Sequence, residues 1–341
     1  MKIVNGIKKL IGNKHFSQYL HHINNHDVKP PWKIMFYGTD DFSVASLNAL
    51  CNEYRRGSLI NQLEVVTAQK VKISPVMKYA AKENLVIHSW PVNPSECKRF
   101  HIGIVVSFGY LIPENIIQSF SMGMINVHAS LLPRWRGAAP IIYALANGDK
   151  ETGVTIMNIK PRKYDIGEII SQATVKILPE DRLPQLLTKL ATAGANELLK
   201  VLKDLSNYLK HAKAQPQEGV TFAPKITSKN AIVTWTKLSS TSVINLDKAL
   251  TGLYPLMTTF SDSPLKLYNV STSASGNVSD GEIFPGTIRY CKESQIIEIQ
   301  CADGKWIRVK HVGVPGKKMM TATDFNNGFL SKKLKHLRIC R

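Results

Sequence analysis

The chain has 341 residues, enough for two domains of ordinary size, and its 44% hydrophobic content argues against a largely disordered protein. No apolar run approaches the roughly 18–20 residues that a membrane span needs, so we expect a soluble protein with no membrane partner. The net charge of +19 favours a polyanionic partner such as a nucleic acid, because lysine and arginine gain by displacing counterions from phosphates.

The cysteines argue against both a disulfide framework and a zinc site. Their number is odd, and no CxxC pair or Cys/His cluster occurs among them: Cys51, Cys97, Cys291, Cys301 and Cys340. We therefore expect reduced thiols in a reducing compartment, and no metal site.

Residues 1–31 have the character of a separate segment. They carry five lysines and a single acid, Asp27, and Ile3, Ile7, Leu10 and Ile11 fall near helical spacing. A basic, acid-poor, amphipathic start is typical of a mitochondrial presequence, which would place the protein in the matrix. The absence of arginine leaves an alternative open, a disordered basic arm that helps to hold RNA. A secretory signal is disfavoured, because the segment has no continuous apolar stretch.

From Trp32 onward, buried-strand patterns alternate with helical ones. Strands are predicted at Lys33–Tyr37, Leu63–Thr67, Ile102–Ser107, Met124–His128, Thr152–Ile159 and Glu168–Ile177. Helices are predicted near residues 42–50, 75–84, 113–120, 138–146 and 184–209, the first of them capped by Asp40 or Asp41. This alternation predicts an α/β domain over residues 32–210, with a doubly wound, Rossmann-like sheet of parallel type.

The character of the sequence changes after Leu209. Residues 211–228 are polar around Pro216 and are predicted to be a linker. Short strands are then predicted at Ala231–Trp235, Leu265–Val270, Thr287–Tyr290, Ile296–Gln300 and Trp306–Val312. Short strands at this spacing favour a small OB-like β-barrel over residues 229–330, followed by a basic tail at residues 331–341. Exposed lysines and arginines on such a barrel would bind a nucleic-acid backbone.

The most informative stretch is NVHASLLPRWRGAAP, residues 126–140. Asn126 and His128 are predicted at the carboxyl end of a strand, where alternate residues point to the same side. In open α/β sheets the ligand crevice lies beyond the carboxyl ends of the strands, so two polar side chains should converge there. An Asn-x-His pair by itself would still be weak evidence for a catalytic site.

The longer motif, INVHASLLPRWRGAAPI, closely resembles the signature of the folate-dependent formyltransferases, and among them the methionyl-tRNA formyltransferases. The resemblance extends to GTDDF at residues 38–42, SFGYLIP at 107–113, GVTIM at 153–157 with Asp165-Ile166-Gly167, FAPKI at 222–226 and GVPGKKMM at 313–320. It implies transfer of a formyl group from 10-formyltetrahydrofolate, without a metal, to the α-amino group of methionyl initiator tRNA. A protein of this type would act as a monomer in the initiation of mitochondrial translation.

The resemblance also implies roles for particular residues. Asn126, His128 and Asp165 would be catalytic: an amide donor for the oxyanion, a proton shuttle, and a carboxylate acting as base or orienting group. Ser130, Leu131, Leu132 and Pro133 would border the formyl-folate. Arg134 and Arg136 would contact the RNA, with the folate tail or acids of the fold as alternative partners.

Two other functions remain open at the level of sequence. One is a formyltransferase or formyl-folate hydrolase with the same core, acting on amino sugars or other small molecules. The other is an RNA-binding protein that has lost its catalytic activity.

Overall fold

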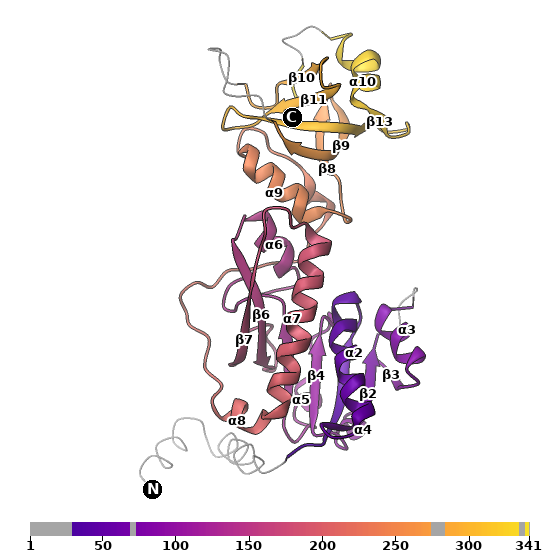
Figure 1. Ribbon diagram of the computed structural model, residues 1–341, viewed down its shortest axis with the longest axis vertical. Helices are drawn as coiled ribbons and strands as arrows, with labels where there is room; N and C mark the ends of the chain where they lie inside the picture. Colours follow the sequence, from indigo (N-terminus) through magenta and orange to yellow (C-terminus); the bar gives the residue numbers. More distant parts are fainter. Residues whose placement is uncertain (1–28, 69–72, 274–283, 334–337, 341) are drawn as a thin grey trace. The chain divides into compact units, whose positions relative to one another are not determined.

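The computed structural model describes residues 29–68, 73–273, 284–333 and 338–340, so nearly all of the predicted presequence or basic arm lies outside the described residues. The contacts divide the chain into two compact units (Figure 1). The N-terminal unit comprises Met1–Pro140, Thr152–Lys176 and Leu187–Phe222. The C-terminal unit comprises Ile141–Glu151, Ile177–Leu186 and Ala223–Arg341.

A seven-stranded sheet with the order β3-β2-β1-β4-β5-β6-β7 forms the centre of the N-terminal unit. Its strands are β1 (Trp32–Gly38), β2 (Ile60–Thr67), β3 (Val86–Ser89), β4 (Ile102–Val106), β5 (Met124–His128), β6 (Glu151–Asn158) and β7 (Ile169–Lys176). The first five strands are parallel, and β6 runs antiparallel to β5. The predicted α/β sheet is confirmed, and all six predicted strands are present. The additional strand, β3, was missed because it is short and partly exposed.

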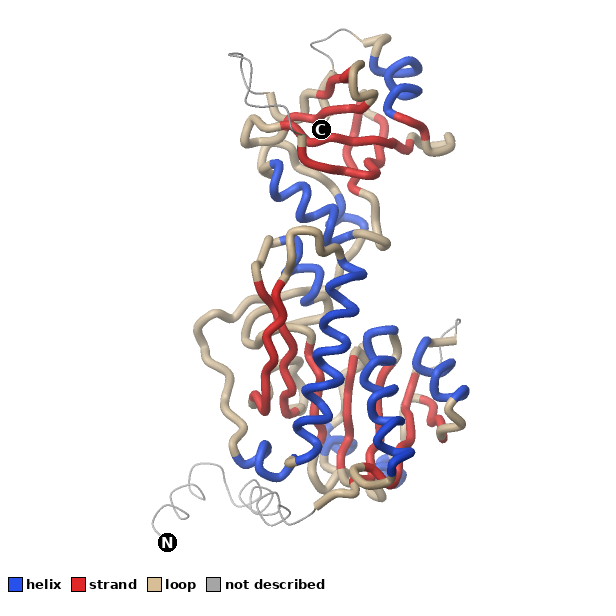
Figure 2. Tube along the Cα trace, viewed as in Figure 1, coloured by secondary structure: helices blue, strands red, loops and turns tan. Residues whose placement is uncertain are grey.

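Helices cover both faces of this sheet. They are α2 (Asp41–Arg56), α3 (Pro75–Lys82), α4 (Pro94–Cys97), α5 (Glu114–Ile117), α7 (Leu183–Lys203) and α8 (Leu205–Lys210). The Asp40 carboxylate caps α2 by accepting the backbone N–H of Ser43, as predicted. In Figure 2, α2 and α7 lie in front of the strands. A cluster of buried residues that includes Phe100, Phe108 and Phe120 packs within the same unit. The single helix predicted for residues 184–209 is divided at Asp204 into α7 and α8.

The C-terminal unit is built on an antiparallel sheet with the order β10-β11-β12-β9-β8, and β13 pairs with β12. The strands are β8 (Leu256–Phe260), β9 (Ser263–Thr272), β10 (Ile288–Cys291), β11 (Ile296–Gln300), β12 (Trp306–Gly313) and β13 (Met320–Thr321). The helices that accompany them are α6 (Pro140–Ala146), η1 (Ser228–Ala231), α9 (Ser240–Leu250), α10 (Ala322–Phe325) and η2 (Asn326–Leu330). Trp235, Phe260 and Phe325 are among the large residues of its core.

Two details of this unit differ from the prediction. Residues 231–235 are not a strand. Ala231 is the last residue of η1, and Ile232 makes only an isolated β-bridge to Met257. The end of the chain is more than a basic tail, because its backbone forms two isolated β-bridges. Cys340 pairs in this way with Phe260 of β8, and Ile339 pairs with Thr287 beside β10. The C-terminal segment therefore pairs at both edges of the sheet, which is what closure into a barrel requires. An OB-type arrangement remains a prediction.

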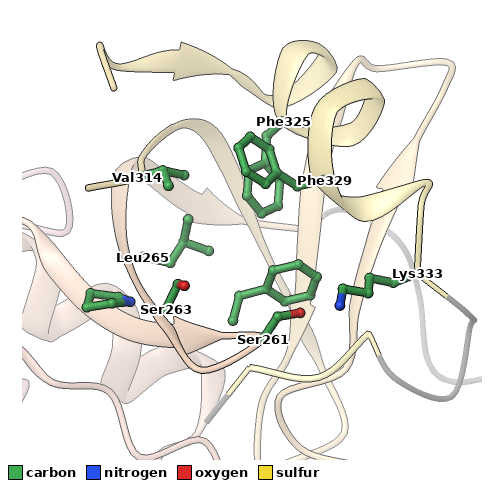
Figure 3. A pocket seen from close by; sticks show the side chains of 9 residues that line it. Ser261, Ser263, Leu265, Val314, Phe325, Phe329 and Lys333 are labelled. Atoms are coloured by element: carbon green, nitrogen blue, oxygen red, sulfur yellow. The ribbon is translucent and has the colours of Figure 1, made fainter. Parts of the chain in front are cut away.

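The C-terminal unit also contains a pocket of about 410 Å³ that is open to solvent (Figure 3). Phe325 and Phe329 stack against each other in its wall, with Leu265 and Val314 beside them. Its single titratable side chain is that of Lys333. The rest of the lining is mostly apolar, with the hydroxyls of Ser261 and Ser263 as its other polar side chains. Among the described helices, none is long and apolar enough to cross a membrane.

Candidate active site

Strand β5 brings two of the predicted catalytic side chains to the same side of the sheet. Asn126 and His128 are two residues apart on β5, which lies between β4 and β6. Asn126 is half-buried, and no other described residue hydrogen-bonds to its amide group, so that group remains able to bind a ligand. His128 is only 6% exposed.

The His128 imidazole is held between two oxygen atoms. Its Nε2 lies 3.0 Å from the backbone oxygen of Trp135, and its Nδ1 lies 3.5 Å from Oδ1 of Asp165. The contact with Trp135 is a hydrogen bond. The contact with Asp165 is within ion-pair distance and at the upper limit of hydrogen-bond length. A doubly protonated ring could donate toward both oxygens, whereas a neutral ring could donate toward only one of them. The surroundings thus fix the orientation of the ring, because each of its nitrogens faces an acceptor oxygen.

The loop between β6 and β7 carries Asp165 to this imidazole. Asp165 has a positive φ of 53°, and its second carboxylate oxygen accepts the backbone N–H of Gly137 at 2.9 Å. The loop closes tightly at Gly167, where a Cβ atom would lie 1.6 Å from the backbone oxygen of Asn158. Two features therefore position the carboxylate. One is the backbone conformation of the β6–β7 loop, and the other is the RWRG segment (residues 134–137), whose Gly137 N–H it accepts.

The predicted folate-binding residues, Ser130 to Pro133, form a loop that is fastened to the sheet. The buried Thr155 hydroxyl donates to the Ser130 backbone oxygen at 2.6 Å and accepts the Leu132 N–H at 3.1 Å. Gln172 donates to the backbone oxygen of Leu132 at 3.0 Å and to Oγ1 of Thr155 at 2.9 Å. This loop is thus ordered by neighbours on β6 and β7, and it follows directly on His128.

The two predicted RNA-binding arginines have different surroundings. The Arg134 guanidinium lies 4.4 Å from the centre of the Trp135 ring, a cation–π distance. Arg136 donates from Nε and Nη2 to Oε1 of Gln215, at 3.0 and 2.6 Å. The backbone of this segment is in turn bonded to Thr221, whose Oγ1 accepts the Trp135 N–H at 2.8 Å.

A second segment of the family resemblance, SFGYLIP at residues 107–113, begins where β4 ends. The Thr39 hydroxyl, just after β1, donates to the backbone oxygen of Ser107 at 2.7 Å, so the carboxyl ends of these two neighbouring strands meet. Ser107 has a positive φ of 45°. Beyond it, Phe108 is buried, whereas Tyr110 is 38% exposed. Asp40 follows Thr39 in the sequence, and burial raises the pKa of its carboxyl group.

Sequence reasoning missed Thr155, Gln172, Gln215 and Thr221. Thr155 and Gln172 lie within predicted strands, but nothing in their spacing reveals that they fasten a loop. Gln215 lies in a polar stretch next to Pro216, which is the usual composition of a linker. Only the FAPKI resemblance lay close enough in the sequence to direct attention to Thr221.

Comparison with known families agrees with this geometry. A model of the formyl transferase family matches residues 95–202, and a model of the formyl transferase C-terminal domain matches residues 225–330. Together these matches cover more than half of the chain and both of its units.

Individual proteins give the same result. The chain is 40% identical over 312 residues to the mitochondrial methionyl-tRNA formyltransferase of Homo sapiens, covering 89% of this chain and 79% of that protein. It is 31% identical to the methionyl-tRNA formyltransferase of Staphylococcus aureus, covering 87% and 96%. An N-formyltransferase structure from Helicobacter canadensis, in complex with folinic acid and dTDP-3-aminofucose, shares the fold with a TM-score of 0.61, 18% identity, and coverage of 82% and 98%. The chain therefore belongs to the formyltransferase family, among the methionyl-tRNA formyltransferases.

Proposed function

We propose that this protein transfers the formyl group of 10-formyltetrahydrofolate to the α-amino group of methionyl initiator tRNA. The main support for the proposal is the position of His128 between the carbonyl of Trp135 and the carboxylate of Asp165. His128 lies on β5, the strand that also carries Asn126. Acyl transfer to an amine needs an oxyanion donor, a proton carrier and a group that orients the carrier. These three side chains supply one of each.

In the proposed mechanism, the neutral amine of methionine attacks the formyl carbon of the folate. The carbonyl oxygen becomes an oxyanion, to which the Asn126 amide donates a hydrogen bond without itself titrating. His128 takes up the proton released by the attacking nitrogen and can return it to the departing folate nitrogen. Asp165 stabilises the imidazolium that forms in between. The loop from Ser130 to Pro133 would border the folate.

Binding of the tRNA is proposed to use both units. The outer side of the C-terminal sheet carries Arg289 and Arg308, which flank the buried carboxylate of Glu298 at 2.7 and 3.5 Å. Arg289 also lies 3.9 Å from the centre of the Trp306 ring. Two arginines around one carboxylate leave a net positive charge, which suits a phosphate backbone. In the N-terminal unit, Arg134 and Arg136 are proposed to serve the same partner.

We further propose the sequence-based partition into an N-terminal segment (1–31), a catalytic domain (32–210), a linker (211–228) and a tRNA-binding domain (229–330). We also propose a location in the mitochondrial matrix; the human and rat relatives, which are mitochondrial methionyl-tRNA formyltransferases, support a mitochondrial location. Residues 1–31 fused to a fluorescent protein should direct it to mitochondria. A diffuse signal in the cytosol would instead favour the RNA-binding arm.

The catalytic assignment is tested by formyl transfer from labelled 10-formyltetrahydrofolate to mitochondrial Met-tRNA. His128→Ala and Asn126→Ala should each lower kcat by about 10²–10³-fold. His211→Ala is the matched control, because His211 is exposed and, among the described residues, its ring hydrogen-bonds only to the Asn207 backbone oxygen. Full activity of His128→Ala would refute the catalytic role of His128, and no transfer by the wild type would point to an RNA-binding protein without catalysis. Transfer to amino sugars but not to Met-tRNA would point to a small-molecule formyltransferase.

A further inference from the structure

We infer that Gln215 is a positioning residue, which holds the Asp165 turn and the Arg136 guanidinium in their working arrangement. The inference rests on the proposed role of Asp165. Gln215 is 8% exposed, although its neighbours Ala214 and Pro216 are exposed. A lone buried amide in an otherwise exposed segment costs free energy unless its hydrogen bonds are made.

All of those hydrogen bonds are made to the candidate site. The Gln215 Nε2 donates to the backbone oxygens of Asp165 and Gly167, at 3.0 and 2.9 Å. Its Oε1 accepts two N–H groups of Arg136. An amide has two donor hydrogens and two acceptor lone pairs, so Gln215 is fully used. It joins the two segments that meet at His128, namely the RWRG segment and the β6–β7 loop.

The bonds to the β6–β7 loop fix a backbone conformation that the loop would not adopt readily by itself. Asp165 has φ of 53°, in the left-handed region that residues other than glycine adopt at a cost. The two carbonyls that Gln215 binds lie on either side of Ile166, directly after this strained position. Loss of both bonds should let the turn relax and move the carboxylate away from Nδ1 of His128, from which it is now 3.5 Å.

The bonds to Arg136 have a different consequence. Gln215 is neutral, and in the described part of the chain the Arg136 guanidinium has no carboxylate partner. Its charge is therefore oriented without being compensated, and its remaining N–H groups can bind an anionic oxygen. A glutamate at position 215 would neutralise that charge, whereas the natural glutamine preserves it.

Gln215→Glu tests the positioning role. The substituted side chain keeps its size and can still accept from Arg136, but it cannot donate to the carbonyls of Asp165 and Gly167. We expect kcat to fall about 10²-fold, as for a catalytic group displaced by about 1 Å, with an unchanged KM for 10-formyltetrahydrofolate. Gln300→Glu is the matched control, because Gln300 is also buried and donates to a backbone oxygen, that of Gly304, within the C-terminal unit. It should keep full kcat.

A double-mutant cycle with Asp165→Asn separates positioning from a general structural effect. It is measured in single turnovers with enzyme in excess, so that slow variants remain measurable. If Gln215 acts through the carboxylate, Gln215→Glu should slow the Asp165→Asn enzyme far less than the wild type. An equal slowing in both backgrounds, or a wild-type rate for Gln215→Glu alone, would overturn the inference. If Gln215→Glu fails to fold, Gln215→Met replaces it with the same expectations. A fully active Asp165→Asn enzyme would instead refute the proposed role of Asp165.

Discussion

At the scale of single residues, the Thr155 hydroxyl makes three hydrogen bonds around the loop that follows His128. It donates to the Ser130 backbone oxygen and accepts from the Leu132 N–H and the Gln172 amide, all in a buried position. Thr155→Val keeps the shape of the side chain but removes the hydrogen bonds to the Ser130 oxygen and the Leu132 N–H, and Gln172 keeps its bond to the Leu132 oxygen. We expect a loss of about 1–3 kcal/mol in the free energy of unfolding, measured in urea. Activity should fall as well.

The control for this substitution is Thr192→Val on α7. Thr192 is exposed, and its hydroxyl donates to the Thr188 backbone oxygen within the same helix. The free energy of unfolding should stay within about 0.5 kcal/mol of the wild type. Equal losses for the two variants would mean that the loop contacts of Thr155 contribute nothing specific.

The cysteine thiols provide a residue-scale prediction that depends on pH. Burial raises the pKa of Cys51 to about 11, and that of Cys301 and Cys340 to about 12. Hydrogen bonds from Ser294 lower the pKa of Cys291. Because the thiolate is the reactive form, only about one Cys51 in a thousand is reactive at pH 8. Iodoacetamide should therefore modify Cys291 first, as read by mass spectrometry, and raising the pH should increase labelling of the others. Labelling of Cys301 before Cys291 in the folded protein would contradict this order of thiol pKa values.

At the scale of elements, the tight closure of the β6–β7 loop leads to a prediction about Gly167. A Cβ at this position would lie 1.6 Å from the Asn158 backbone oxygen, and no flexible side chain is there to give way. Gly167→Ala should therefore force the two strand ends apart and cost at least about 2–3 kcal/mol, in the range of strained or overpacked sites. It should also displace Asp165 and lower kcat. Circular dichroism melts and single-turnover rates would measure the two effects.

Gly328→Ala is the corresponding control in the C-terminal unit. Nothing lies within 4 Å of a Cβ at that position, and its φ is not positive. We expect it to leave stability unchanged or to raise it slightly, because alanine reduces the freedom of the unfolded chain. If both glycines tolerated alanine, the closure at Gly167 would not control the position of the loop.

The elements also show how far periodicity can lead. The apolar runs that became β1, β4 and β5 are buried on both sides, so composition alone was sufficient to predict them. Val86–Ser89 lies at the sheet edge with two exposed residues, and its pattern carries no comparable signal. Residues 231–235 have the composition of a strand, but Ala231 is the last residue of the 3-10 helix η1, and Ile232 makes a single β-bridge to Met257. Tertiary context decided these cases.

The site shows the same limit in another form. The motif placed Asn126 and His128 on one strand, and that placement follows from local geometry. The approach of Asp165 to His128 depends on a loop 37 positions farther along the chain, and only the family resemblance indicated it. Nothing in the sequence indicated a role for Gln215, because the sequence does not distinguish a buried glutamine from a solvent-exposed one. Long-range hydrogen bonds of this kind leave no periodic trace.

At the scale of the whole molecule, the net charge of +19 determines how the protein should meet its RNA substrate. Many of the lysines are exposed, and Lys305, Lys310, Lys317 and Lys318 lie in the C-terminal unit. Each lysine that contacts a phosphate releases counterions, so affinity should fall steeply with salt. For six to ten such contacts, the affinity for Met-tRNA should drop about 10³–10⁵-fold between 50 and 200 mM salt.

Lys310→Gln tests whether the C-terminal sheet takes part in this binding. Lys310 is exposed on β12, at the same alternation as Arg308, whose side chain reaches Glu298. Removing one phosphate contact should lower the slope of log K against log salt by about 0.9 and weaken binding at low salt, while kcat at saturating tRNA stays unchanged. Lys98→Gln is the control, since Lys98 is exposed beside α4 in the N-terminal unit. Filter-binding titrations at several salt concentrations would give both slopes. If the Lys310 variant kept the wild-type slope while the Lys98 variant lost it, the RNA would bind through the N-terminal unit instead.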